Sequence, residues 1–180
     1  MSNTRKRGSK AAVKPVAKPA RPAEAATFTV TKIGDGDDRN RSDARCDTST
    51  NNGSQCTLRA AIEEANDTAG ADTVDFDTGG GAKTIKPASG LPTITDAVTI
   101  DGYTQRGARP NTLAGGNDAV LKVKLNGSDA GTNADGLEIS TSNSTIRGLV
   151  IDRFDDDGFV ISGSDAMGNR VEGNFVGTNN

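Results

Sequence analysis

The fold is decided by four short phrases, each of which ends in glycine and has an aliphatic residue two positions earlier. They read Thr99-Ile100-Asp101-Gly102, Lys124-Leu125-Asn126-Gly127, Thr145-Ile146-Arg147-Gly148 and Arg170-Val171-Glu172-Gly173. The glycines lie 25, 21 and 25 residues apart, and a variant without glycine, Thr73-Val74-Asp75-Phe76, ends 26 residues before the first. A period in the twenties, carried by short apolar segments, is typical of repeat proteins whose units stack on one another.

Stacking the phrases by their glycines predicts two columns of side chains along the repeat. The inward column contains Val74, Ile100, Leu125, Ile146 and Val171. The outward column contains Asp75, Asp101, Asn126, Arg147 and Glu172, so that Arg147 and Glu172 become neighbours. Further strands are predicted at residues 83–85, 119–121, 136–139 and 158–161. The sequence thus predicts an all-β fold, a right-handed parallel β-helix (solenoid) with one short N-terminal capping α-helix, whose coils occupy residues 73–180.

Composition limits what this fold contains. Only 33% of the 180 residues are hydrophobic and 3% are aromatic, while 22 are glycine. Such a chain can build only a narrow core of Val, Ile and Leu. The sequence has no His, which excludes imidazole catalysis and His metal ligands. Because the predicted coil ends in a turn without a second cap, we expect it to continue in a longer chain or to self-associate through that end.

The first 26 residues differ from the rest in charge. They carry seven Lys and Arg against one Glu, whereas residues 27–180 carry fourteen basic and twenty-three acidic side chains. The segment is also rich in Pro and Ala, so residues 1–26 are predicted to be a disordered basic tail. It has no apolar run long enough for a recognisable signal peptide, and the sequence contains no transmembrane segment. The acidic remainder argues against specific nucleic-acid binding.

Residues 27–72 are predicted to hold a strand, a cysteine loop and the capping helix. The two cysteines, Cys46 and Cys56, are compatible with a disulfide, with free thiols or with a shared metal. Two thiolates without His make a poor zinc site, so a disulfide and an oxidising compartment are favoured. The helix follows at residues 57–66, with apolar residues at helical spacing and Thr57 as its N-cap.

The segment Cys56-Thr57-Leu58-Arg59-Ala60-Ala61 resembles the CSLREA motif of secreted or surface bacterial β-helix proteins in the pectin-lyase-like superfamily. The resemblance continues at residues 62–66, 70–76, 91–95, 98–102 and 173–178. Thr57 and Ala60 replace the Ser and Glu of the motif, which removes half of its capping box. The resemblance implies a right-handed parallel β-helix at the cell surface. It also implies that polysaccharide lyase or hydrolase activity must be considered, because the superfamily includes such enzymes.

Two acidic groups are candidates for chemistry. A polysaccharide lyase or glycoside hydrolase needs a base or a pair of carboxylates, for which Asp155, Asp156 and Asp157 are the catalytic candidates. Asp-rich turns are common without any such role. Asp35, Asp37 and Asp38, with Asp43 and Asp47 nearby, are the metal candidates. Their spacing does not fit an EF-hand, so they would form an irregular calcium site if they bind an ion at all.

We therefore expect a non-catalytic structural or binding module of a secreted or cell-surface protein, in contact with glycans or other surface material. Two alternatives remain open at this stage. The first is a polysaccharide lyase or glycoside hydrolase, and the second is a basic tail that anchors the protein to an anionic polymer. Calcium is the one cofactor that the sequence leaves open.

Overall fold

The computed structural model describes residues 24–41, 43–51 and 55–177. The predicted tail at residues 1–26 therefore lies almost entirely outside the described residues. The described chain contains one α-helix, eleven strands and two 3-10 turns. In chain order these are β1(Thr27–Val30), α1(Leu58–Asp67), β2(Asp72–Phe76), β3(Lys83–Ile85), β4(Val98–Asp101), η1(Gly102–Thr104), β5(Val123–Asn126), η2(Gly127–Asp129), β6(Leu137–Ile139), β7(Thr145–Arg147), β8(Leu149–Asp152), β9(Phe159–Ile161), β10(Arg170–Glu172) and β11(Phe175–Val176).

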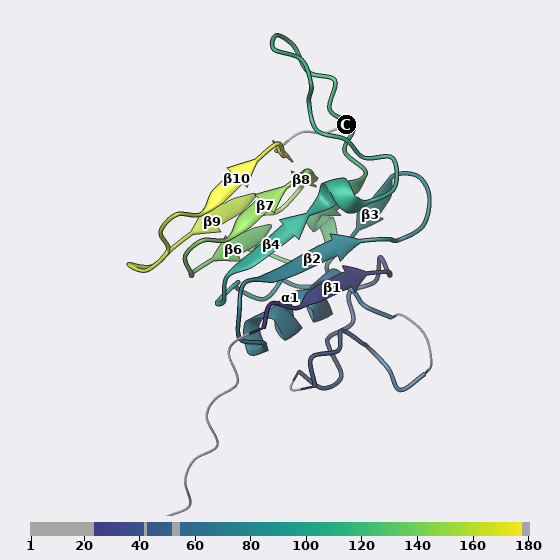
Figure 1. The fold of residues 1–180 in the computed structure, drawn as a ribbon, viewed down its shortest axis with the longest axis vertical. Coiled ribbons are helices and arrows are strands. Elements are labelled where there is room, and N and C mark those ends of the chain that lie inside the picture. The colour runs from purple at the N-terminus through teal and green to yellow at the C-terminus, as the bar shows by residue number, and fades with distance from the viewer. Residues whose placement is uncertain (1–23, 42, 52–54, 178–180) are drawn as a thin grey trace, which may run out of the picture.

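The strands form three separate parallel sheets. The first sheet has the order β1-β2-β4-β7-β10, the second β11-β8-β5-β3, and the third pairs β6 with β9. The chain passes from the first sheet to the second and then to the third, so that neighbouring strands in a sheet come from successive passes. Figure 1 shows the first sheet rising from β1 to β10, with α1 beside β1 at the N-terminal end.

The predicted register holds for most of the inward column. Val74 pairs with Ile100, Ile100 with Ile146, and Ile146 with Val171. Arg147 and Glu172 are paired neighbours, as the outward column predicted. In β2, β4 and β7 the inward residue is completely buried, because apolar side chains from all three sheets meet in one narrow core.

Leu125 does not belong to this column. It lies in the second sheet, where it pairs with Ile85 and Ile151, and Asn126 pairs with Asp152. The same phrase occurs in both sheets because a strand of each sheet ends in the same kind of turn. The side chains of Asp101 and Asn126 each accept a hydrogen bond from a backbone amide two residues later and so begin a 3-10 turn.

The predicted all-β, right-handed parallel β-helix is accordingly wrong. The structure has three short, separate parallel sheets and one α-helix, which is a mixed arrangement of helix and sheet. The glycine spacing misled the prediction because residues 106–122 form a long loop that displaces the second phrase into another sheet. The predicted strand at residues 119–121 is also absent, and Val120 makes only an isolated bridge to Arg109.

Helix α1 forms where the sequence predicted it. The Thr57 hydroxyl accepts a hydrogen bond from the Ala60 amide at 3.1 Å, so the remaining half of the capping box is intact. Leu58, Ala61 and Ile62 pack into the core and the helix contacts β1 and β2. A helix of ten residues is marginal in water, so its stability comes from this packing.

Candidate functional site

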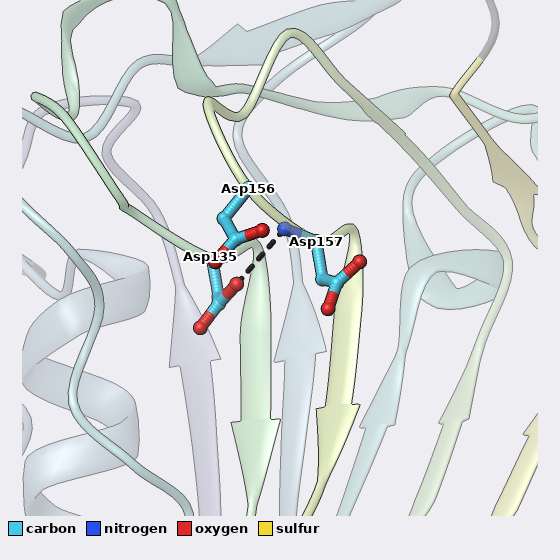
Figure 2. A group of neighbouring side chains, drawn as sticks. All are labelled: Asp135, Asp156 and Asp157. Carbon is cyan, nitrogen blue, oxygen red and sulfur yellow. Dashed lines mark hydrogen bonds between the residues drawn. The ribbon is translucent and has the colours of Figure 1, made fainter.

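The three catalytic candidates lie in the turn between β8 and β9. Asp156 and Asp157 face Asp135, which precedes β6, and one carboxylate oxygen of each lies within 4.8 Å of the others. Figure 2 shows the backbone amide of Asp157 donating a hydrogen bond of 2.9 Å to Asp135. Asp155 is not part of this group, since its carboxylate accepts a hydrogen bond from the Asn133 amide.

This carboxylate group is poorly placed for catalysis. Asp156 and Asp157 are exposed, and Asp156 lines a cavity of about 80 Å³ together with Arg153. Pockets that hold small molecules measure roughly 300–1,000 Å³. The three oxygens are close enough for a hard cation, which accepts loosely spaced carboxylate ligands. The hydrogen bond from Asp157 to Asp135 also gives the group an ordinary role in holding the turn.

The three metal candidates near the N-terminus do not converge. Asp35 binds the guanidinium of Arg59 at 2.9 and 3.0 Å and accepts the Ala88 amide. Asp37 is largely exposed, and its carboxylate lies 3.8 Å from the same guanidinium. Asp38 is buried and accepts hydrogen bonds from two backbone amides of its own loop. The carboxylates of Asp35 and Asp38 thus serve different parts of the fold.

The predicted disulfide is present. Cys46 and Cys56 are bonded, and their Cα atoms are 4.9 Å apart. The bond joins the loop after β1 to the residue that precedes the helix cap, and Cys56 itself is buried in the core. The two alternatives, free thiols and a shared metal, are excluded by this bond.

A cavity that the sequence did not predict lies beside the first sheet. Its volume is about 640 Å³, within the range of small-molecule sites. It is bounded on one side by the loop at residues 106–122, which projects from the body in Figure 1, and on the other by β7, β10 and β11. We call it the Tyr103 cleft; its lining residues include Tyr103, Asn111, Asn117, Arg147, Glu172 and Phe175.

The Tyr103 side chain lies against Gly148 and Gly173, the glycines of two of the repeated phrases. Its hydroxyl donates a hydrogen bond of 2.9 Å to the Gly173 carbonyl. Gly148 and Gly173 both have positive φ, and a Cβ atom on either would collide with Tyr103. Glycine therefore serves two purposes here, since it permits the left-handed backbone and leaves room for the aromatic ring. The ring is half-buried and fixed in orientation.

The charged side chains in and beside the cleft form ion pairs with one another or with neighbouring residues. Arg147 donates to Asp101 at 2.6 Å, and this hydrogen bond raises the pKa of the guanidinium. Glu172 is the next outward residue along the sheet. Burial and the neighbouring Asp101 raise the pKa of Tyr103, so its hydroxyl remains protonated at neutral pH. The cleft thus offers two aromatic side chains, amide groups and an already neutralised cation.

The sequence contained one signal for this cleft. Tyr103 is the single tyrosine of the chain and directly follows the first glycine-closed phrase. The other wall depends on the loop at residues 106–122, whose base is closed by mutual backbone hydrogen bonds between Arg109 and Val120 at 2.9 and 3.0 Å. This isolated bridge is not accompanied by an alternating apolar pattern in the sequence, so the sequence does not predict it.

Comparisons of the chain with family models, with curated proteins and with solved structures found no match. Within the described residues, no helix has the length and apolar character of a membrane span.

Proposed function

We propose that this chain is a non-catalytic binding module of a secreted or cell-surface protein and that it binds a glycan in the Tyr103 cleft. The observation that carries the proposal is the Tyr103 ring, whose hydroxyl is held by the Gly173 carbonyl in a cleft of about 640 Å³ that is lined by both apolar and polar side chains. A sugar presents C–H groups on one face and hydroxyls at its edge. Aromatic rings pack against the C–H face, and Asn, Arg and Glu side chains form hydrogen bonds with the hydroxyls.

The charges favour a neutral glycan over an acidic one. Arg147 is the cation that would meet a uronate carboxylate, but Asp101 already binds it and Glu172 is its neighbour. A buried or half-buried cation with a bound carboxylate has little attraction left for a second one. The same pairing speaks against lyase chemistry in the cleft, where a cation must neutralise the substrate carboxylate.

The lining also favours binding over hydrolysis. Among the described residues that line the cleft, Glu172 is the only carboxylate. Hydrolysis of a glycosidic bond generally uses two carboxyl groups on opposite sides of the bond. The Asp135, Asp156 and Asp157 group lies elsewhere, beside a cavity that is too small for a sugar chain. A surface location is supported by the disulfide, because such bonds persist in oxidising compartments.

The test is affinity electrophoresis and calorimetry of the full chain against neutral polysaccharides, with polygalacturonate as the acidic comparison. Tyr103→Ala should weaken binding at least tenfold, which corresponds to about 1.4 kcal/mol. Tyr103→Phe keeps the ring and should bind within about threefold of the wild type, a difference of under 1 kcal/mol. Asp156→Asn is the matched control outside the cleft and should leave binding unchanged.

Three outcomes would replace this proposal. Turnover of a polysaccharide that is lost in Asp156→Ala would make the chain an enzyme. Retention on heparin or DNA that disappears when residues 1–26 are removed would assign binding to the basic tail. Binding to neutral glycans that is equal in Tyr103→Ala and the wild type would exclude the Tyr103 cleft as the site.

A second class of partner is favoured by the far edge of the first sheet. Strand β10 is the last in its sheet and has one strand neighbour among the described residues, β7. Val171 in this strand is 40% exposed, and Val176 and Ile161, in the last strands of the other two sheets, are 45% and 49% exposed. An edge of unpaired backbone groups with apolar side chains is a template for another strand. We propose that it pairs with the same edge of a second copy, which light scattering across a concentration series would detect.

A further inference from the structure

Glu64 is a buried carboxylate that the fold leaves without a hydrogen-bond partner. It lies in α1 and has no exposed surface. Neither of its side-chain oxygens is bonded to any of the residues that the structure describes. Its neighbour Glu63 is also buried but is fully engaged, since it accepts the Asp38 amide at 2.6 Å and pairs with Arg41. Two adjacent glutamates of one helix thus have opposite environments.

The charged groups that raise the pKa of Glu64 are all acidic. They are Asp38, Asp43 and Asp67, and the carboxylates of Asp38 and Glu64 could share a hydrogen bond only if one of them were protonated. Ionised carboxylates are acceptors only, so two that face each other require something positive between them. Burial and then Asp38 raise the pKa of Glu64 to about 8, which expresses the same conflict.

Two cations of this loop, Arg39 and Arg41, are engaged elsewhere. Arg41 pairs with Glu63, and Arg39 binds Asp47 at 3.2 Å. The Asp38 oxygens accept the amides of Asn40 and Asp47 at 2.7 and 2.9 Å, which fixes the carboxylate and leaves each oxygen a free lone pair. A fixed, buried carboxylate opposite an unpartnered one is the preorganised half of a site for a hard cation.

We propose that Glu64 and Asp38 bind a calcium ion between α1 and the loop that follows β1. Calcium accepts six to eight oxygens in a flexible arrangement, and water completes its coordination where the protein supplies few carboxylates. Asp43 and Asp67 add negative charge to the site without needing to touch the ion. Of the three metal candidates expected from the sequence, Asp38 alone takes part, and its partner comes from the helix.

The ion would have a structural role. Asp38 belongs to the loop that follows β1, which the disulfide ties to the start of the helix at Cys56, and Glu64 belongs to the helix itself. A cation between them joins the two elements and removes the repulsion that burial creates. This inference is independent of the Tyr103 cleft, because no residue is shared between the two sites.

The experiment uses the full chain, stripped with a chelator and dialysed, and measures its melting temperature and calcium binding by calorimetry. Calcium at about 100 times its dissociation constant should raise the melting temperature of the wild type by roughly 5–10 °C. Glu64→Gln should lose this rise. It should still fold, and without calcium it should be at least as stable as the wild type, because the amide removes a charge that the site repels.

Asp156→Asn is the matched control, since it changes the other carboxylate group, and it should keep the full calcium response. A calcium response of the same size in Glu64→Gln would overturn the proposal. So would a wild type that does not respond, which would mean that a shared proton occupies the gap. Magnesium demands a stricter octahedral geometry, so an equal response to magnesium would overturn the assignment of calcium.

Discussion

The two ends of the first sheet differ in what covers them. At the β1 end, α1 packs against β1 and β2, the disulfide holds the loop, and Arg59 is buried among polar partners. At the β10 end, the strand is exposed along its whole length. Ile146 is completely buried, whereas Val171, its paired neighbour one strand further, is 40% exposed. Similar phrases therefore contribute differently, because burial depends on whether a further element lies beyond the strand.

The largest difference in stability between the two ends is expected when one arginine is removed at each end. The Arg59 guanidinium, with a side chain 8% exposed, binds Asp35 and the carbonyls of Ser89 and Gly90. Arg59→Ala leaves Asp35 without its cation and should lower the free energy of unfolding by about 3–5 kcal/mol. Arg170→Ala removes an exposed pair with Glu172 and should cost less than about 1 kcal/mol. Urea unfolding of both variants measures the difference, and equal losses would refute it.

The next comparison is within one column of the core. Ile146→Ala creates a cavity at a fully buried position and should cost about 3 kcal/mol. Val171→Ala, at the exposed edge, should cost less than about 1 kcal/mol. Chemical denaturation with both variants tests this ratio. If Val171→Ala proved as costly as Ile146→Ala, the β10 edge would be covered in solution.

The disulfide should contribute a smaller amount at the covered end. It closes a loop with a sequence separation of 10, and the chain-entropy account gives about 2–3 kcal/mol for such a loop. The Cys46→Ser, Cys56→Ser double variant should lose that much stability while keeping the helical signal in circular dichroism. Reducing agent should lower the melting temperature of the wild type and leave the double variant unaffected. A response of the double variant would point to another cause.

The smallest expected effect concerns Asp72, which starts β2 under the helix. One of its oxygens accepts the Ala26 amide at 2.7 Å, and the other has no partner among the described residues. Burial raises the pKa of this carboxyl from its ordinary value of 3.8. Below that value both folded and unfolded chains are protonated, so nothing is lost. As the pH rises through the higher folded pKa, the folded state loses stability relative to the unfolded one.

Asp72→Asn should therefore gain stability over the wild type as the pH rises, by up to about 1 kcal/mol at neutral pH. The gain should vanish below about pH 4, where the unfolded wild type no longer ionises. Melting curves of the two proteins between pH 3 and pH 8 measure it. A difference that does not change with pH would show that the carboxyl does not titrate in this range.

The features that the sequence predicted are those that short segments determine. Helix α1 and its Thr57 cap follow from local spacing and one hydroxyl. The register of Val74, Ile100 and Ile146 follows from the period. Leu125 was assigned to the wrong sheet because both sheets use the same apolar residue followed by a polar turn former. A spacing argument cannot separate two sheets that share a signature.

The sites were harder to predict because they depend on distant contacts. The Tyr103 cleft requires a loop whose position is set by the bridge between Arg109 and Val120. Glu64 reads in the sequence as one of two acidic residues on a helix surface. It becomes unusual only in the folded chain, where its side chain has no exposed surface.

The bridge at the base of the loop has a practical consequence for engineering and for natural variation. Since Arg109 and Val120 tie the two stems together, the residues between them carry none of the strand pairing of the three sheets. Doubling the length of a flexible insertion costs only about 0.6 kcal/mol. Foreign peptides could be grafted at this tip, and ligand preference could diverge there, while the rest of the scaffold stayed intact.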